Sequence, residues 1–108
     1  DFNYVDDAVD AFLAAAVNPN AVGKVMNLGS KEVINLKDLA AKMVAIAGKG
    51  SWELVPFPPE RKAIDIGDYY SDYSLITSLL GWQPKVNLDT GLAQTIAYYH
   101  HNGDSYWE

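Results

Sequence analysis

The sequence predicts a small α/β domain in which about four helices pack on a small mixed sheet of about three short strands. Short β-branched or aromatic runs alternate with segments whose apolar residues recur every three or four positions. The order strand–helix–strand–helix–strand–loop–helix–helix favours helices packed on one small sheet. The length of 108 residues suits one modest core, so residues 1–108 are expected to form a single domain.

The first half of that order begins with an aromatic, β-branched run at residues 2–5, which predicts a strand. Asp7 then stands where an N-cap belongs, and the following apolar residues keep helical spacing: Val9, Phe12, Leu13, Ala16 and Val17. The run Asn18-Pro19-Asn20 predicts the end of this helix. Residues 24–28 (KVMNL) predict the second strand.

A second helix is predicted to begin at Asn35, whose side chain can cap it, with Asp38 three residues later as a variant of the capping box. Its apolar face comprises Leu36, Leu39, Ala40, Met43 and Ala47, and Gly48 is expected to end it. Residues 52–57 (WELVPF) predict the third strand, which the prolines that follow would end. Residues 60–70 lack a helical period and predict an ordered loop.

Two more helices complete the expected fold. Ser71 or Asp72 is the predicted cap of the third, and Gly81 its predicted end; its apolar residues are Leu75, Ile76, Leu79 and Leu80. Asn87 is the predicted cap of the fourth, with Leu88, Leu92, Ile96 and Tyr99 on one side.

Composition excludes several classes of function. Fourteen acidic against eight basic residues give a net charge of −6, which disfavours a nucleic-acid binder or a polybasic membrane-surface module. The chain has no cysteine, so disulfides, thiolate-bound metals and thiol catalysis are excluded. This composition is consistent with a cytoplasmic protein. No apolar run reaches the length of a membrane span.

Motifs for redox cofactors and metals are also missing from the sequence. The only Gly-x-Gly, at Gly48, follows a helix instead of preceding one, so it is not a dinucleotide-binding loop. No tyrosine has a lysine four residues later, so a Tyr-x-x-x-Lys pair is absent. His100 and His101 are adjacent on a predicted helix and would point about 100° apart, which is unsuited to one metal ion. We therefore expect no catalytic, cofactor-binding or metal-binding residue in this chain.

The loop at residues 60–70 is the strongest candidate for chemistry. Arg61 is the only arginine of the chain, and it follows a proline-stiffened segment. A guanidinium fork suits a diphosphate, and a nearby carboxylate such as Asp65 can orient the guanidinium or accept from a sugar hydroxyl. From the residues alone, a structural role remains open, in which Arg61 and Asp65 only hold a surface loop in place.

Four stretches, in order, resemble the NAD-dependent epimerase/dehydratases, the extended short-chain dehydrogenase/reductase family that acts on nucleotide sugars. The chain is similar to the C-terminal portion of these enzymes. The matching stretches are DFNYVDDAVDA at residues 1–11, VMNLG at 25–29, FPPERKAIDIGD at 57–68, and DYS at 72–74 followed by LGWQP at 80–84. The first resembles an Arg-Asp-Phe-x-Tyr-Val-x-Asp pattern that lacks its arginine here, and Leu75 replaces a lysine of the fourth.

The resemblance implies that Arg61 contacts a nucleotide diphosphate and that Asp65 helps to hold it. In the commoner Arg-x-x-Asp form of the family, the arginine position falls on Lys62, so Arg61 and Lys62 both remain candidates. The Rossmann half of such enzymes supplies NAD binding and the Tyr-x-x-x-Lys catalyst. We therefore expect this chain to be a substrate-binding domain and part of a longer protein, without activity of its own as an isomerase or lyase.

An alternative is a stand-alone module that has lost the enzymatic half and self-associates. For either reading, we expect weak binding of a nucleotide-diphosphate sugar and a homodimer. In the complete family fold this region packs against the Rossmann half, so an isolated domain would expose apolar surface that a second copy could cover. The first strand could also supply an unpaired edge.

Overall fold

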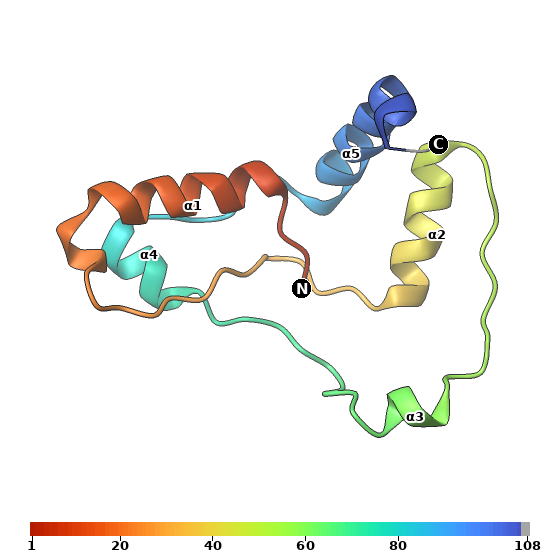
Figure 1. Cartoon of the computed structure of the whole chain (residues 1–108), viewed down its shortest axis with the longest axis horizontal. Helices are drawn as coiled ribbons and strands as arrows, with labels where there is room; N and C mark the ends of the chain where they lie inside the picture. The colour runs from red at the N-terminus through yellow and green to blue at the C-terminus, as the bar shows by residue number, and fades with distance from the viewer. Residues whose placement is uncertain (107–108) are drawn as a thin grey trace.

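The computed structural model describes residues 1–106 and is helical. Its elements are α1 (Val5–Val17), the short 3₁₀ helix η1 (Pro19–Ala21), α2 (Leu36–Ala47), α3 (Pro59–Lys62), α4 (Ser74–Leu80), α5 (Leu88–Asn102) and η2 (Gly103–Ser105). No residue in this described range is in a β-strand. The predicted α/β class with a small mixed sheet is therefore wrong, and Figure 1 shows helices joined by long irregular segments.

The three predicted strands are irregular or helical segments. Residues 24–28 and 52–57 have no regular structure, and Val5 of the predicted first strand is already the first residue of α1. A strand needs a neighbouring strand to pair its N–H and C=O groups, and within residues 1–106 no backbone hydrogen bond joins these segments to one another. Strand-like composition alone therefore did not produce a sheet.

The predicted caps of two helices are confirmed. The Asn35 side chain accepts a hydrogen bond from Asp38 N at 2.9 Å, and the Asn87 side chain accepts one from Thr90 N at 2.8 Å. Gly48 and Gly81 follow α2 and α4 with φ of 66° and 69°, the left-handed conformation that glycine adopts without strain. These ends were predictable because each depends on one local side chain or one glycine.

Two other predicted caps are misplaced. Tyr4 stands at the N-cap of α1, so Asp7 lies inside the helix, where its carboxylate has other partners. Tyr73 stands at the N-cap of α4, and Ser71 and Asp72 precede it. Asp72 still accepts a hydrogen bond from Ser74 N at 2.8 Å, and this bond lowers the pKa of the Asp72 carboxyl. The predicted capping carboxylate of Asp72 is therefore present at the start of α4, one residue before the observed N-cap.

A small core lies where α1 meets α4 and the segment that follows α4. Ala11, Ile76 and Trp82 are buried together, and the partly buried side chains of Met26, Leu28, Tyr73 and Leu80 pack against them. The rings of Tyr73 and Trp82 meet edge to face with centroids 6.1 Å apart, a favourable arrangement for an aromatic pair. In Figure 1, α1 and α4 lie one above the other at this place.

Hydrogen bonds to Asp7 of α1 hold the segment that follows α4 against α1. Its side chain is 2% exposed, and one carboxylate oxygen accepts hydrogen bonds from Lys85 N at 3.1 Å and Val86 N at 3.0 Å. Its carbonyl oxygen accepts a third from Trp82 Nε1 at 2.9 Å. A buried carboxylate is tolerated because backbone N–H groups replace its water. Asp7 of α1 therefore holds Trp82, Lys85 and Val86 of the segment that follows α4.

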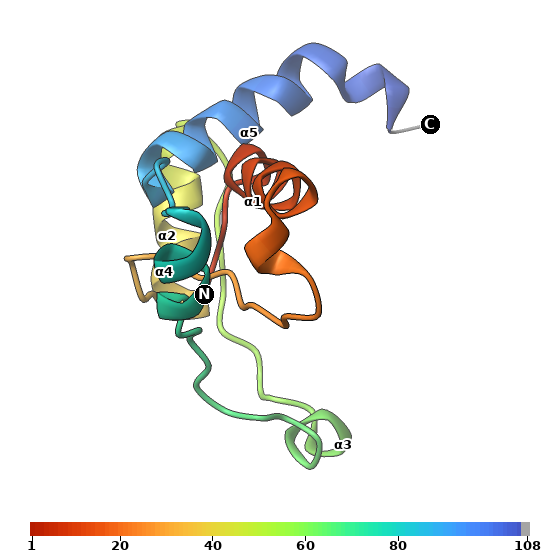
Figure 2. The ribbon, with the colours of Figure 1, turned by 90° about the vertical axis from the view of Figure 1, so that its left-hand side faces the viewer.

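A second packing region joins α2 and α5. Lys42 Nζ of α2 lies 2.6 Å from Asp89 Oδ1 of α5, at a partly exposed ion pair. Gly91 of α5 is buried against Tyr4, and a Cβ at this position would meet the tyrosine ring at 3.1 Å. The side view of Figure 2 shows that α2 meets α5 near the N-terminal end of α5. The absence of a side chain at Gly91 thus lets the N-terminal segment approach α5 closely.

The chain is much more open than a compact protein of its size. Its accessible surface is 8335 Å², about 2,400 Å² more than the roughly 6,000 Å² expected for a folded monomer of 11.9 kDa. Its radius of gyration is 16.9 Å, against about 13 Å for a compact chain of this length. Residues 49–70, hereafter the arm, extend to α3 away from the other helices in Figures 1 and 2, and all of them except Pro58 are exposed.

Candidate functional site

The arm carries the two cations that the sequence singled out. Arg61 and Lys62 are the last two residues of α3, and both side chains are exposed. Pro59 occupies the first turn of α3, where its fixed φ suits a helix start, and Pro58 O accepts hydrogen bonds from both Arg61 N and Lys62 N. The proline pair therefore builds the single helical turn that presents the two cations. Within residues 1–106, neither cation takes part in an ion pair.

Asp65 has a local role in this structure. Its Oδ1 accepts a hydrogen bond from Gly67 N at 2.8 Å, and Gly67 has a φ of 75°. This is the geometry in which an aspartate side chain stabilises a turn two residues on. No hydrogen bond among the described residues joins Asp65 to Arg61 or Lys62. The three residues thus share one exposed bend of the arm, and the Asp65 carboxylate keeps a second oxygen for another donor.

The arm is fixed to the rest of the chain where it returns to α4. Asp1 Oδ1 accepts a hydrogen bond from Ser30 N at 2.8 Å, and Asp1 Oδ2 accepts one from Ser71 N at 2.7 Å. One carboxylate therefore links the N-terminal segment, the segment before α2 and the residue that directly follows the arm. Sequence reasoning missed this role, because the two partners lie 29 and 70 residues away and no local pattern marks them.

Close packing around Gly29 reinforces the same junction. A Cβ at Gly29 would meet the Tyr73 ring at 2.7 Å and Ser71 O at 2.9 Å, closer than side chains normally approach. The Ser71 hydroxyl in turn lies 2.9 Å from the hydroxyl of Tyr69, an exposed aromatic residue of the arm. Contacts therefore hold the C-terminal end of the arm in place, whereas its central part, with Arg61, is exposed to solvent.

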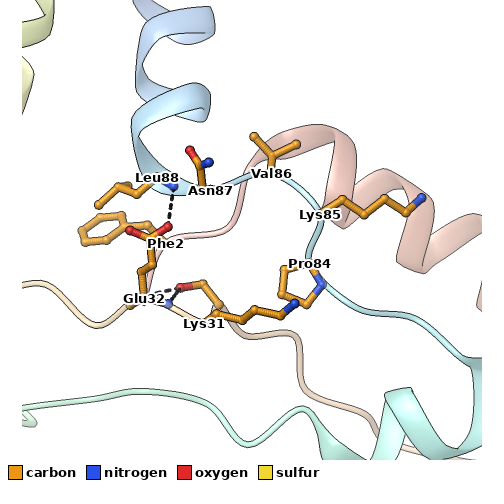
Figure 3. A pocket seen from close by; sticks show the side chains of 9 residues that line it. Phe2, Lys31, Glu32, Pro84, Lys85, Val86, Asn87 and Leu88 are labelled. Atoms are coloured by element: carbon orange, nitrogen blue, oxygen red, sulfur yellow. Dashed lines mark hydrogen bonds between the residues drawn. The ribbon is translucent and has the colours of Figure 1, made fainter.

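A cavity of about 240 Å³ lies beside the start of α5 (Figure 3), and it does not suit an anion. Two lysines line it, but the Glu32 carboxylate occupies the helix start by accepting a hydrogen bond from Leu88 N at 3.0 Å. Lys85 pairs with Asp10 of α1 at 2.7 Å, and this hydrogen bond raises the pKa of the Lys85 ammonium. Glu32 and Lys85 of this cavity thus already have partners within the chain.

Comparison with known proteins shows to which family the chain is related. A dTDP-glucose 4,6-dehydratase of Streptomyces griseus is 35% identical over 105 residues, which is 97% of this chain. A GDP-L-fucose synthase of Arabidopsis thaliana is 32% identical over 94% of the chain, and a UDP-glucose 4-epimerase of Mycolicibacterium smegmatis is 30% identical over 92%. The chain belongs to the NAD-dependent sugar epimerase/dehydratase family.

This family assignment confirms the resemblance found in the sequence, and it concerns a segment of each relative. The chain spans about 30% of the length of these relatives, with 31% for the dehydratase and 30% for the epimerase and the synthase. No family model matches the chain. No solved structure matches it either.

The epimerase/dehydratase relatives differ in the nucleotide and the sugar that their names give: dTDP-glucose, UDP-glucose and GDP-L-fucose. All three names share a nucleoside diphosphate joined to a sugar. In the described part of the chain, no helix is both long and apolar enough to cross a membrane.

Proposed function

We propose that this chain is the substrate-binding part of a nucleotide-sugar epimerase or dehydratase, in which α3 of the arm contacts the diphosphate. The family assignment carries the proposal, because nucleoside diphosphates are what the names of the three relatives share. Arg61 and Lys62 support it, because they are adjacent, exposed cations without an ion pair among residues 1–106. Charge-assisted hydrogen bonds from such groups to phosphate oxygens are strong.

Catalysis in this proposal belongs to another part of the protein. The oxidation of a sugar hydroxyl needs NAD and an acid–base pair, and the sequence has neither the glycine loop nor a Tyr-x-x-x-Lys pair. We therefore propose an NAD-binding Rossmann domain as the partner that completes an isomerase or lyase. We place the protein in the cytoplasm, which the cysteine-free composition fits, and we propose that it is a homodimer.

The nucleotide contact can be tested with UDP-glucose and dTDP-glucose as probes. Titration calorimetry of the 108-residue chain is expected to show weak binding, because only part of a binding site is present. Arg61→Ala should weaken this binding about tenfold or more, the effect of losing a charged hydrogen bond of about 1.5 kcal/mol. Lys62→Ala tests the neighbouring cation in the same way.

The matched control is Lys37→Ala, which removes an exposed cation from α2 instead of the arm. If Lys37→Ala weakens binding as much as Arg61→Ala, the effect is one of net charge and the assignment to α3 fails. If neither Arg61→Ala nor Lys62→Ala changes the affinity, the arm cations have a structural role and the proposed contact is wrong.

The chain alone is expected not to bind NADH. The backbone turn that receives a pyrophosphate at a helix start needs glycines between a strand and a helix, and this sequence has none in that arrangement. Fluorescence titration with NADH should therefore give a linear, unsaturable signal. Saturable binding at micromolar concentration would contradict the expectation and would locate cofactor-binding groups within these 108 residues.

A further inference from the structure

The two ends of the arm are attached to the rest of the chain in different ways. Its start directly follows Gly48, the left-handed residue that ends α2. Its end is fixed at Ser71 by the Asp1 carboxylate and by the close packing of Gly29. Between these points, no hydrogen bond or ion pair within the described range joins residues 49–68 to a residue outside the arm. The position of α3 therefore depends on how the two ends are held.

Ser71 is held at both its N–H and its carbonyl group. The N–H donates to Asp1 Oδ2 at 2.7 Å, and the carbonyl oxygen lies so close to Gly29 that a Cβ there would approach it to 2.9 Å. The other oxygen of Asp1 accepts a hydrogen bond from Ser30 N at 2.8 Å. Hydrogen bonds to an ionised acceptor are about twice as strong as neutral ones. Asp1, Gly29, Ser30 and Ser71 together form what we call the Asp1 junction.

Hydrogen bonds connect the Asp1 junction to the first turn of α5. The Ser30 hydroxyl donates to Glu32 O at 2.8 Å and accepts from Glu32 N at 3.1 Å. The Glu32 carboxylate accepts a hydrogen bond from the N–H of Leu88, the first residue of α5, as Figure 3 shows. The junction is therefore connected to the helical part of the chain, and the arm is attached to that part through Ser71.

A small rotation of the chain at Ser71 becomes a large displacement at α3. Lys62 lies nine residues before Ser71, and a stretch of that length spans up to about 30 Å when extended. A rotation of about 10° at Ser71 therefore moves the cations of α3 by up to about 5 Å. Hydrogen bonds to a phosphate oxygen need a donor within about 3 Å, so a displacement of this size breaks them. The direction of the chain at Ser71 thus determines where the two cations stand.

We propose that Asp1 is a positioning residue for the nucleotide contact. Its carboxylate does not bind the nucleotide, because both oxygens accept hydrogen bonds from backbone donors and a negative charge repels a diphosphate. It sets the direction in which the arm joins the helical part of the chain, and so the place of Arg61 and Lys62. The inference rests on the proposed function and deepens it, because it identifies the group that holds the contact residues in place.

Distances between two spin labels test whether Asp1 fixes the arm. The chain has no native cysteine, so Val17→Cys in α1 and Ile64→Cys in the arm can carry one label each; these side chains are 83% and 81% exposed. Asp1→Asn keeps the size of the side chain, but its amide nitrogen cannot accept a hydrogen bond, so Ser30 N or Ser71 N loses its acceptor. Pulsed electron paramagnetic resonance should show a clearly broader distribution of label distances in the Asp1→Asn chain.

Nucleotide affinity tests whether this fixing matters for binding. Asp1→Asn should weaken the binding of UDP-glucose about fivefold, because the arm cations then occupy the correct place for only part of the time. In a chain that already carries Arg61→Ala, the further loss should be clearly smaller, because Asp1 acts through the arm cations. A residue that only stabilised the fold would cause the same loss in both chains. Ligand-observed NMR measures these weak affinities, and far-UV circular dichroism should be unchanged, because Asp1 lies outside the core.

The matched control is Asp6→Asn, which makes the same charge change at an exposed residue near the start of the chain. It should alter neither the label distances nor the affinity. Equal effects of Asp1→Asn and Asp6→Asn would overturn the proposal, because net charge would then explain them. An unchanged distance distribution in the Asp1→Asn chain would also overturn it, and so would a broader distribution with an unchanged affinity.

Failure of the proposed nucleotide contact would give a different pattern. Arg61→Ala and Lys62→Ala would then leave the affinity unchanged in a chain with native Asp1, whereas the label distances would still respond to Asp1→Asn. That pattern would overturn the diphosphate contact and, with it, the role of Asp1 toward the nucleotide. The attachment of the arm through Asp1 would stand, so the two proposals can be judged separately.

Discussion

Replacing Asp7 with alanine is expected to lower the free energy of unfolding by about 3 kcal/mol or more. The substitution leaves Lys85 N and Val86 N without their acceptor in a part-buried position, and each lost partner costs about 1–3 kcal/mol. It also opens a gap beside the small core of Ala11, Ile76 and Trp82. Urea denaturation followed by far-UV circular dichroism measures the change.

Asp6→Ala is the matched control, because Asp6 is the preceding residue of the same helix turn and is exposed. It removes the same charge from the start of α1 and should change stability by no more than about 0.5 kcal/mol. Asp7→Asn keeps an oxygen acceptor of similar shape and should fall between the two alanine variants. Similar losses for Asp6→Ala and Asp7→Ala would show that charge near the helix start, and not the link to residues 85–86, explains the effect.

Replacing Trp82 with alanine is expected to cost about 3–5 kcal/mol, the range for removing a large buried aromatic side chain. The indole is 5% exposed, packs edge to face on Tyr73 and donates a hydrogen bond to Asp7 O. Its loss removes the side chain that holds α1 to the segment after α4. Thermal and urea unfolding, followed by circular dichroism, should both show the loss.

Trp82→Phe separates packing from hydrogen bonding. It retains an aromatic ring but leaves Asp7 O without its donor, so we expect a smaller cost of about 1–2 kcal/mol. Trp52→Ala is the control for removing a tryptophan, because Trp52 lies in the arm and is 40% exposed. If Trp52→Ala destabilised the chain as much as Trp82→Ala, the arm would be part of the folding core and the described division of the chain would be wrong.

The sequence was informative where one local group decides the structure. Asn35, Asn87, Gly48 and Gly81 mark helix ends as predicted, because a cap depends on a side chain within three residues or on one left-handed backbone position. Residues 60–70 were predicted to form an ordered loop, whereas Arg61 and Lys62 are the last two residues of the single helical turn α3. Their contact with a diphosphate stays a prediction.

Features that depend on distant residues were not predictable. The strand-like runs at residues 24–28 and 52–57 remain irregular, because composition does not supply the neighbouring strand that a sheet requires. Asp7 was predicted to cap a helix. Its true partners are Lys85 N and Val86 N, which lie 78 and 79 residues further along the chain, so no local pattern could indicate them. The spacing of the apolar residues of α1 predicted the helix correctly but could not reveal that Phe12 and Leu13 are exposed.

The same long-range hydrogen bonds determine how this chain can reach its fold. Trp82 and Val86 bond to Asp7 across 75 and 79 residues, so the core forms only after a loop of nearly three quarters of the chain has closed. Individual helices form within about a microsecond, whereas contacts distant in sequence slow folding because the entropy of loop closure is lost first. Despite its helical content, the chain should therefore fold with the kinetics typical of proteins rich in non-local contacts.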